Sequence, residues 1–579
     1  MKLTGGAILT RALEDAGIEL AFGIPGTHNI ELYDALFESK TVRIVLVTDE
    51  QSASFMADGA WRSSGRMACV NLVPGAGLTH AMSGIAEAFL DHVPMLVLGC
   101  GIRRDTQRAF QLHDVDQEAL ARPVVKGTYR PEAGDDLYGT IRKACDLAQR
   151  GAPGPVFVEV PMNLYLFKHE VDLDTEAAEA AWASTADHAP APDSIRAAAE
   201  LIAGAKRPLM YVGAGAVGAL DEVLRLAELL DAPVSTTFQG KGVFPEDHAL
   251  SLWPGYGQTA PSFVRKIAED CDLTIAVGCR FSEVGTGSYA LEPQGPLIHI
   301  DIDPDALGRN YQTAVAIAAD AKLALRELIQ ATGDEHRPYD EARRERIRRG
   351  HAEVWEEWLA YVGAERVTPA HLLRTAQRVF GPGTIYTTDS GNGTFLAMEC
   401  LRLDRPRKYL APVDFSCMGY SVPSALGAKL ASPEHPVVAL AGDGAFLMTG
   451  LEMLTAVQEG IGAVIIVLRD RELAQIAQIQ STALNRKVAS AVHEYELRHF
   501  AAAVHVDYLH LEIDGDVEDT LRQAQEITLQ GRPVLVEVEI DYSRRTFFTK
   551  GVLKANLHRL PFKDRMRFIG RAVYRKLTE

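Results

Sequence analysis

Short runs of β-branched and other apolar residues recur along the chain, and a segment long enough for a helix follows each run. Nearly continuous apolar strands that alternate with helices are typical of parallel sheets covered on both faces. The pattern therefore predicts an α/β protein built from doubly wound parallel sheets. The runs that we interpret as buried strands are Ile44–Val47, Ala68–Val73, Met95–Leu98, Val156–Val160, Leu209–Val212, Thr274–Val277, Leu297–Ile302, Ile385–Thr388, Val437–Leu440, Val464–Leu468 and Val534–Val538.

Two segments without this alternation divide the chain into three parts of similar length. Residues 171–194 carry acids, alanines and prolines, and residues 333–350 are densely charged, as surface linkers often are. A length of 579 residues also suits several domains rather than one. The expected organisation is one domain each at 1–170, 190–332 and 360–545, followed by a tail at 546–579.

Two segments far apart in the chain are nearly the same. Residues 155–160 read Pro-Val-Phe-Val-Glu-Val, and residues 533–538 read Pro-Val-Leu-Val-Glu-Val. A duplication that produced the first and third domains explains the match, and chance similarity between two strand sequences of low complexity explains it equally well.

Charge and composition exclude several classes of protein. A formal net charge of −18 disfavours a nucleic-acid partner. The hydrophobic fraction is 47%, and no apolar run reaches the length of a membrane span, so a membrane location is not expected. The seven cysteines form no CxxC pair, which argues against a disulfide framework. Arg11, Glu14 and Asp15 interrupt any signal-peptide core, so we expect a cytoplasmic protein.

The clearest chemical motif is Gly442-Asp443-Gly444, which follows the predicted strand Val437–Leu440. Glycines at such a turn let the backbone approach a phosphate, and the carboxylate between them can bind a bridging divalent cation. Asp470 follows the next predicted strand, 27 positions later. Because adjacent parallel strands end at the same edge of a sheet, we expect the two carboxylates to lie together. For the tripeptide alone, an ordinary Asp-Gly turn is the alternative.

This arrangement resembles the signature of thiamine-diphosphate enzymes, in which Gly-Asp-Gly is followed at a similar distance by Asn-Asn. The resemblance extends over nearly the whole chain and is closest to the acetolactate synthase-like 2-oxoacid decarboxylases and carboligases. It implies a pyrimidine-binding, a central and a diphosphate-binding domain. The segments that carry it are Phe22–Gly26, Leu32–Leu36, Gly240–His248, His299–Pro304, Met418–Tyr420 and Gly427–Leu430.

The resemblance assigns a metal site with one departure, since the family's Asn-Asn is Arg469-Asp470 here. By position, Asp443, Asp470 and the backbone carbonyl of Glu472 would bind Mg²⁺, for which a carboxylate is a suitable ligand. Asp470 adds negative charge beside a diphosphate, and Arg469 or Arg471 could balance it. A degenerate, empty site is the alternative.

Glu50 takes the position of the family's catalytic glutamate, which contacts the cofactor's aminopyrimidine. There a carboxyl group relays a proton and helps to deprotonate the thiazolium carbon, the nucleophile of the reaction. A glutamate that only stabilises a helix N-terminus is the alternative.

The resemblance implies further contacts to the cofactor. Met418, 25 positions before Asp443, would support the cofactor's bent conformation, although a lone methionine is usually a core residue. Asn392 and Gly393 replace the family's Gln-His in the loop on the diphosphate side. The other expected contacts are Cys417, Gly442, Gly444 and Ala445.

The expected substrate end departs from acetolactate synthases. His113 stands where they carry an active-site glutamine, and His80 stands where the family has asparagine. A histidine transfers protons near neutral pH, whereas an amide does not. A hydrogen-bonded structural histidine is the alternative for each. Gln475 and Ile479 also replace residues of the substrate channel, so the acceptor need not be pyruvate.

A glycine-rich segment, Gly213–Gly218, follows a predicted strand of the middle domain. A GxGxxG pattern by itself is weak evidence for a dinucleotide. In acetolactate synthases this domain holds FAD in a structural role, and Arg280 lies at a matching position. Many relatives keep the domain without the flavin, so FAD stays an open alternative.

The combined interpretation is an enzyme that uses thiamine diphosphate and Mg²⁺ to decarboxylate a 2-oxoacid and add the remaining fragment to a carbonyl acceptor. The resemblance also implies a homodimer or homotetramer in which Glu50 of one subunit meets the Asp443 site of another. Three alternatives stay open. They are a decarboxylase that releases an aldehyde, a NAD- or FAD-dependent oxidoreductase built on Gly213–Gly218, and a non-catalytic paralogue that binds the cofactor.

The tail is the last unassigned feature. From Tyr542 onward there are eleven basic and two acidic residues, although the whole chain is acidic. Apolar residues such as Phe562 and Phe568 interleave with the bases. The segment could be a helix packed on its own subunit, a strap over the active-site mouth or an amphipathic segment on an anionic membrane.

Overall fold

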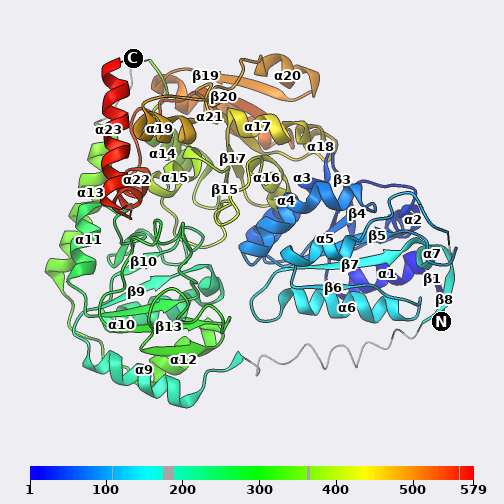
Figure 1. Ribbon diagram of the computed structural model, residues 1–579, viewed down its shortest axis with the longest axis horizontal. Helices are drawn as coiled ribbons and strands as arrows, with labels where there is room; N and C mark the ends of the chain where they lie inside the picture. The colour runs from blue at the N-terminus through cyan, green and yellow to red at the C-terminus, as the bar shows by residue number, and fades with distance from the viewer. Residues whose placement is uncertain (107, 172, 174–187, 361–364, 560, 579) are drawn as a thin grey trace.

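The chain folds around three six-stranded parallel sheets (Figure 1). The predicted class, an α/β protein with three doubly wound parallel-sheet domains, is confirmed. All strands of the three sheets fall within the expected ranges 1–170, 190–332 and 360–545. The computed structural model describes residues 1–106, 108–171, 173, 188–360, 365–559 and 561–578.

The first domain contains β2 (Leu20–Gly23), β3 (Arg43–Leu46), β4 (Cys69–Leu72), β5 (Met95–Gly101), β6 (Gly127–Tyr129) and β7 (Pro155–Pro161), in the order β3-β2-β4-β5-β7-β6. Its helices are α1 (Gly5–Asp15), α2 (Ile30–Phe37), α3 (Glu50–Ser64), α4 (Ala76–Leu90), α5 (Gln117–Ala121), η1 (Arg122–Val124), α6 (Asp136–Gln149) and α7 (Met162–Leu166). A short antiparallel pair joins β1 (Lys2–Thr4) to β8 (Lys168–Glu170). Val70 and Leu72 of β4 pack with α3 and α4, whereas Cys69 packs with α1 and α6, so helices cover both faces of the sheet.

The middle domain contains β9 (Pro208–Val212), β10 (Val234–Thr236), β11 (Ser251–Pro254), β12 (Leu273–Val277), β13 (Leu297–Asp301) and β14 (Val315–Ala318). Its helices are α9 (Pro192–Gly204), η3 (Ala214–Ala219), α10 (Leu220–Leu230), α11 (Ser262–Glu269) and α12 (Ala321–Thr332). The strand order β11-β10-β9-β12-β13-β14 reverses between β9 and β12. Domains with this order bind dinucleotides in the crevice at the reversal.

The third domain contains β15 (Ile385–Thr388), β16 (Tyr409–Leu410), β17 (Val437–Gly442), β18 (Val464–Arg469), β19 (Asp507–Leu511) and β20 (Val534–Glu539), in the order β16-β15-β17-β18-β20-β19. Its helices are α14 (Pro369–Phe380), α15 (Asn392–Cys400), α16 (Ser421–Ala431), α17 (Asp443–Thr449), η4 (Gly450–Glu452), α18 (Met453–Gln458), α19 (Ala474–Leu484), α20 (Leu497–Ala503), η5 (Asp514–Asp516) and α21 (Val517–Thr528).

The first and third sheets share one topology. In each, the second strand in chain order lies at one edge and the fifth at the other, and the last strand pairs between the fourth and the fifth. The two nearly identical segments, 155–160 and 533–538, fall on β7 and β20, which occupy equivalent positions. The shared topology favours duplication over chance as the origin of the match.

The two expected linkers have different outcomes. Residues 174–187 lie outside the described residues, and α9 begins at Pro192. The expectation of a linker at 333–350 is wrong in part, because α13 (Glu341–Leu359) includes its second half. This helix buries Ile347, Val354 and Trp358 on one side and carries most of its charge on the other. A dense charge pattern therefore marked the solvated face of a helix.

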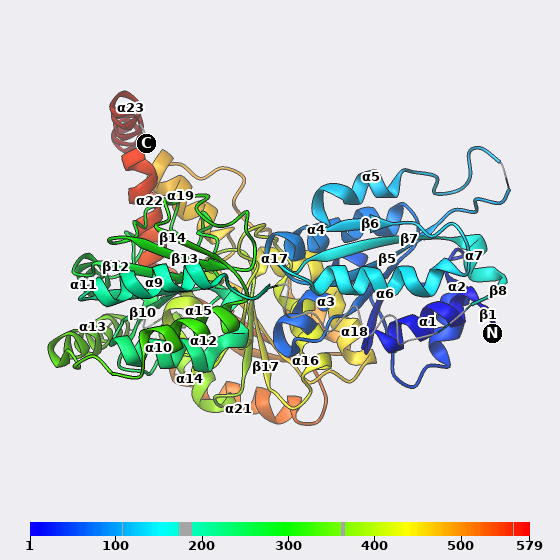
Figure 2. The same ribbon diagram turned by 90° about the horizontal axis from the view of Figure 1, so that it is seen from below.

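The tail forms α22 (Phe547–Arg559) and α23 (Phe562–Thr578). Both views show it beside the middle and third domains, away from the first domain (Figure 1, Figure 2). Arg575 on α23 donates a hydrogen bond to the carbonyl of Leu484 at the end of α19. These contacts support the interpretation of a helix packed on its own subunit. Among the described residues, no helix is both long and apolar enough to cross a membrane.

Helices α3 and α16 pack on each other and join the first domain to the third. A Cβ atom on Gly59 would lie 2.2 Å from the carbonyl oxygen of Ser424, and one on Gly427 would lie 2.0 Å from that of Met56. The glycines thus allow the two backbones to touch, which fixes the relative position of the two helices.

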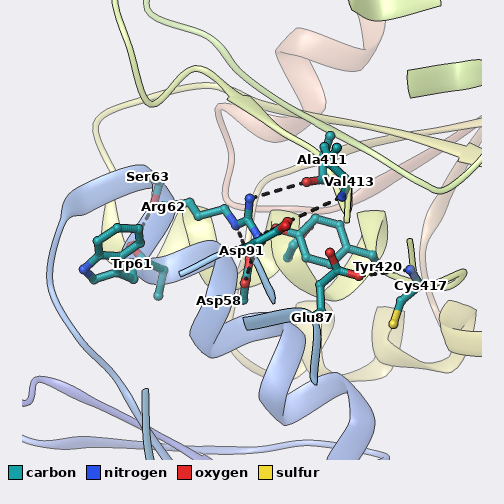
Figure 3. A network of polar contacts seen from close by, with 12 residues as sticks. Asp58, Trp61, Arg62, Ser63, Glu87, Asp91, Ala411, Val413, Cys417 and Tyr420 are labelled. Atoms are coloured by element: carbon teal, nitrogen blue, oxygen red, sulfur yellow. Dashed lines mark hydrogen bonds and ion pairs between the residues drawn. The ribbon is translucent and has the colours of Figure 1, made fainter. Parts of the chain in front are cut away.

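An ion-pair network is buried beside this contact (Figure 3). Arg62 on α3 pairs with Asp58 at 2.6 Å and with Asp91 at 2.8 Å. The hydroxyl of Tyr420, next to α16, donates a hydrogen bond to Asp58. Burial raises the pKa of Asp58, and the charge of Arg62 opposes that rise. A buried charge that loses its partner is strongly destabilising, so the network depends on all of its members.

Candidate active site

Asp443 lies where β17 ends and α17 begins. Its carboxylate is buried and accepts two backbone hydrogen bonds of 2.7 Å, at Oδ1 from Gly444 and at Oδ2 from Arg471. Strand β18 pairs in parallel with β17, and Asp470 follows β18 directly. The structure therefore brings both carboxylates to one edge of the sheet.

The two carboxylates affect each other. Burial, followed by the charge of Asp443, raises the pKa of Asp470 to about 7. The arginines that were expected to balance the charge make their ion pairs with glutamates: Arg469 Nε lies 3.0 Å from Glu537 Oε1, and Arg471 Nη1 lies 3.1 Å from Glu539 Oε2. The charge of Arg469 still opposes the rise that burial causes in the pKa of Asp443. Two carboxylates that lie close together in a partly buried site repel each other, and a bound cation reduces this repulsion.

The side chain of Glu472 is engaged in an ion pair. Both of its carboxylate oxygens bind the ammonium group of Lys487, at 2.6 and 2.7 Å. The N–H of Glu472 donates a hydrogen bond of 3.3 Å to Oδ1 of Asp470, so the backbone of Glu472, whose carbonyl is the expected third ligand, lies next to Asp470. A set of two carboxylates and one carbonyl consists of hard oxygen donors, which fits Mg²⁺.

Asn392 and Gly393 begin α15, immediately after β15, and β15 pairs with β17. They therefore lie at the same sheet edge as Asp443. Gly391 precedes them with a φ of +131°, a conformation that requires glycine. The N-terminus of a helix presents free N–H groups and the positive end of its dipole, which suits a diphosphate.

Met418 is held between two buried carboxylates. Glu87, on α4 of the first domain, accepts a hydrogen bond of 3.0 Å from the N–H of Cys417 (Figure 3). Asp389, after β15, accepts one of 2.8 Å from the N–H of Gly419. Burial raises the pKa of Asp389 to about 6. The methyl group of Met418 comes within 3.9 Å of where a Cβ atom on Gly444 would stand, so Met418 borders the Asp443 turn.

Glu50 is the first residue of α3, and its side chain is only 9% exposed. Its Oε2 lies 3.3 Å from Nδ1 of His80, and Oδ2 of Asp49 lies 3.9 Å from the same nitrogen. His80 is mostly exposed, so it connects the buried carboxyl group to solvent. In the part of the chain that the structure describes, these three side chains form the one group of three His, Cys, Asp or Glu residues whose possible metal-ligand atoms lie within 4.8 Å of one another.

His113 lies in the loop after β5 and packs against His28, a residue that the sequence reasoning missed. The two rings meet edge to face with centroids 5.5 Å apart. Burial, followed by the proximity of His113, lowers the pKa of His28. His28 follows β2, next to the segment Phe22–Gly26, so its place after a parallel strand was a usable signal.

The candidate site residues fall into two sets, one on each of two domains. His28, Glu50, His80 and His113 follow successive strands of the first sheet, while the residues around Asp443 belong to the third. Within the described chain, Glu50 and Asp443 share no hydrogen bond or ion pair. Besides Glu87, one link between the sets is Glu452, which the sequence reasoning also missed: its carboxylate, in the third domain, accepts a hydrogen bond from the N–H of Thr48 in the first.

A cavity of about 410 Å³ lies where the three domains meet, at the reversal of the middle sheet. Gly215, Gly218, Arg280 and Asp301 contribute to its lining. Arg280 spans the junction: it pairs with Asp414 of the third domain at 2.6 Å and contacts the carbonyl of Leu90 in the first. Burial raises the pKa of Asp301 to about 6.

Three family models match this chain in order. They are the thiamine pyrophosphate enzyme N-terminal TPP binding domain at residues 3–120, the central domain at 195–328 and the C-terminal TPP binding domain at 389–538. Thiamine pyrophosphate is another name for thiamine diphosphate. Each match falls on one of the three domains, although the first ends before β6 and β7 and the third begins just after β15. The chain belongs to the thiamine pyrophosphate enzyme family.

Its curated relatives include many acetolactate synthases. The chain is 30% identical to the acetolactate synthase of Mycobacterium bovis, over 91% of this chain and 86% of that protein. It is also 30% identical to the acetolactate synthase isozyme 1 large subunit of Escherichia coli, over 94% of this chain and 95% of that protein. The acetolactate synthase large subunit of Corynebacterium glutamicum is 32% identical over 83% of this chain and 77% of its own length. The resemblance to acetolactate synthase-like enzymes is confirmed.

Proposed function

We propose that this protein uses thiamine diphosphate and Mg²⁺ to decarboxylate a 2-oxoacid and to join the remaining fragment to a carbonyl acceptor. The observation that supports this most is the position of two carboxylates, the buried Asp443 and the half-buried Asp470, at the same sheet edge as the N-terminus of α15. Oxygen donors for a dication and N–H donors for a diphosphate are thereby presented together.

In this proposal, Mg²⁺ is bound by Asp443, Asp470 and the carbonyl of Glu472. The diphosphate lies against Asn392 and Gly393, where α15 begins. When bound, the cofactor supplies a nucleophilic carbon and accepts the negative charge that decarboxylation leaves. The other residues that border it are Cys417, Met418, Gly442, Gly444 and Ala445.

Glu50 holds a proton for the cofactor's aminopyrimidine in this proposal. Its burial keeps bulk water away, and His80, which is 3.3 Å from it and mostly exposed, passes protons between Glu50 and solvent. His113 and His28 transfer a proton at the carbonyl oxygen of the acceptor, where the oxygen of a ketone or aldehyde becomes a hydroxyl group.

A decarboxylase that releases an aldehyde is the second candidate. The observation that favours it is the histidine pair His28–His113, which can protonate a carbon as well as an oxygen. A non-catalytic paralogue and an oxidoreductase are less supported, since neither accounts for the Asp443–Asp470 pair together with Glu50.

Product analysis tests the two candidates. The purified protein is incubated with thiamine diphosphate, Mg²⁺ and a panel of 2-oxoacids, and carbon dioxide and products are followed by mass spectrometry. Carboligation predicts 2-hydroxyketone or 2-hydroxy-2-alkyl-3-oxoacid products. Free aldehyde in stoichiometric amount with carbon dioxide would favour the second candidate, and no carbon dioxide from any 2-oxoacid would contradict both.

A homodimer or homotetramer is part of the proposal. Its support is a row of exposed apolar side chains along α17, η4 and α18, next to the Asp443 turn. Large apolar surfaces in water usually mark an interface. The row consists of Leu447, Met448, Leu451, Leu454 and Val457, which are between 37% and 57% exposed. A second copy that covers this row would lie close to the site.

FAD binding in the middle domain remains a proposal. The cavity of about 410 Å³ is within the usual size range of ligand pockets, roughly 300–1,000 Å³. A Cβ atom on Gly218 would meet nothing within 4 Å, which leaves room beside the glycine-rich turn. Visible flavin absorbance that is released on denaturation would support it, and a colourless protein that gains no activity from FAD would remove it.

The cytoplasm is the proposed location. All seven cysteines are free and buried, which suits a reducing compartment.

A further inference from the structure

A second cavity, of about 200 Å³, opens beside the loops that are proposed to hold the cofactor. Ser390 and Gly391, which precede Asn392, line one side of it. Ser416, which precedes Cys417, lines the same side, and its hydroxyl lies 2.8 Å from that of Ser390. The cavity therefore begins where the diphosphate loop and the methionine loop come together.

Three aromatic rings form the apolar wall of this cavity. Phe238 comes from the middle domain, Phe395 from α15 and Phe548 from α22 of the tail. The rings of Phe395 and Phe548 are stacked with centroids 4.2 Å apart, and those of Phe238 and Phe548 are 4.8 Å apart. Phe548 thus stands at the centre of the wall, and Val552, one turn further along α22, extends it.

Helix α22 is held firmly in this position. Its first N–H group, that of Phe547, donates a hydrogen bond of 2.7 Å to Glu399 on α15. The hydroxyl of Thr546 caps the helix by accepting from the N–H of Thr549 at 3.1 Å. A Cβ atom on Gly551 would lie 2.5 Å from the carbonyl oxygen of Gln258, so α22 touches the backbone of the middle domain. Because this wall is anchored on two domains, it can fix the shape of the cavity.

One polar group reaches the cavity from α19. The side-chain oxygen of Gln475 would lie 3.9 Å from a Cβ atom on Gly391, and within the described residues its amide makes no hydrogen bond. The one charged lining residue, Glu283, is exposed at the edge. A mainly apolar pocket with a single free amide suits a small molecule that has an apolar body and one polar end.

We propose that α22 completes the pocket for the substrate's side chain, and that Phe548 and Val552 limit the size of the apolar 2-oxoacid side chain that the enzyme accepts. The inference rests on the proposed function. It assigns the tail a role in specificity: the amide of Gln475 binds the polar end of the substrate, and the side chain, aliphatic or aromatic, lies against the rings.

The experiment compares 2-oxoacids with methyl, isopropyl, isobutyl and benzyl side chains. Phe548→Ala enlarges the pocket and should raise kcat/KM for the larger side chains relative to the smallest by at least about tenfold, which corresponds to the loss of one steric barrier. Val552→Phe fills the pocket and should shift preference in the opposite direction. Phe562→Ala, on α23 and 75% exposed, is the control and should change nothing.

Binding is measured separately from turnover. In a Glu50→Gln background, calorimetric titration with the same acids should show the same change in size preference. Phe548→Leu is the smaller change if Phe548→Ala lowers the thermal midpoint. Unchanged selectivity in both Phe548→Leu and Val552→Phe would overturn the inference, and the cavity would then be a packing gap or part of the cofactor's own space. Wild-type protein that releases carbon dioxide from none of the acids would instead contradict the proposed function.

Discussion

The carboxylate of Glu452, in the third domain, accepts a hydrogen bond of 3.0 Å from the backbone N–H of Thr48, in the first domain. The same oxygen accepts another, of 3.1 Å, from the N–H of Asp49. Glu452 is fully buried, and burial raises its pKa while the hydroxyl of Thr48 opposes that rise. The turn that delivers Glu50 is therefore held by the domain that carries Asp443.

Glu452→Ala should remove these acceptors and leave two backbone N–H groups unpaired. We expect a loss of about 2 kcal/mol in the free energy of unfolding, from the cost of unsatisfied buried donors. Glu452→Gln keeps one acceptor oxygen in place and should lose much less. Chemical denaturation followed by circular dichroism compares the two variants, and equal losses would show that the hydrogen bonds to Thr48 and Asp49 do not matter.

Glu50→Gln should bind thiamine diphosphate and lose turnover by roughly 10²–10⁴-fold, since it keeps the shape of the side chain and removes the proton. Cofactor binding is followed by calorimetry, and turnover by release of carbon dioxide. His80→Gln is the companion variant: it should slow proton exchange with solvent and leave cofactor binding intact. Rates close to wild type in Glu50→Gln would contradict its assigned role.

Asp443→Ala should abolish retention of Mg²⁺ and, with it, of the diphosphate. Asp470→Asn keeps an oxygen ligand and restores the residue that the family carries, so it should remain active. Direct binding of Mn²⁺, read by electron paramagnetic resonance, reports on the ion without the need for turnover. Should Asp470→Asn lose the ion while Asp470→Ala retains it, the assignment of Asp470 as a ligand is wrong.

His28→Gln and His113→Gln should each lower kcat/KM by about 10²-fold, the lower end of the usual contribution of a general acid or base. If the two rings act as one unit, the double variant should lose little more than either single one. Cofactor binding and the thermal midpoint should not change. A pH–rate profile that both variants share with wild type would indicate that the histidines only pack.

The buried side chain of Glu399, on α15, leads us to expect that stability depends on pH. Burial raises its pKa from 4.5 to about 8, so the folded protein keeps a proton there that the unfolded chain loses. The unfolded chain binds fewer protons between these two values, and stability should therefore fall as the pH rises from 4.5 towards 8.

Glu399→Gln removes this titration and keeps an acceptor for the N–H of Phe547. The variant should be more stable than wild type at pH 8 and should differ little from it near pH 4.5. The control is Glu353→Gln on α13, where the side chain is 62% exposed. Thermal midpoints measured across this range test the prediction, and parallel curves for wild type and Glu399→Gln would contradict it.

The local pattern of apolar and polar residues was sufficient to predict most of the central strands and much of the candidate site. Runs such as Val464–Leu468 are apolar throughout because helices cover both faces of the sheet, so they were visible without any tertiary contact. The proximity of Asp443 and Asp470 was also predictable from the sequence, since each comes directly after a strand and adjacent parallel strands end at the same edge of the sheet. Short strands such as β16, with Tyr409 and Leu410 alone, left too little pattern to detect.

The remaining relationships depend on residues that are far apart in the chain. Glu452 and Thr48 are separated by 404 positions, and nothing in the sequence around either one indicates that they form a hydrogen bond. The charged segment that becomes α13 and the basic tail that becomes α22 were ambiguous for the same reason. The charge and apolar content of a segment limit which surfaces can cover it. Whether the segment is buried depends on the surface that another part of the chain presents to it. Only the packing of the three domains therefore places Phe548 between Phe238 and Phe395.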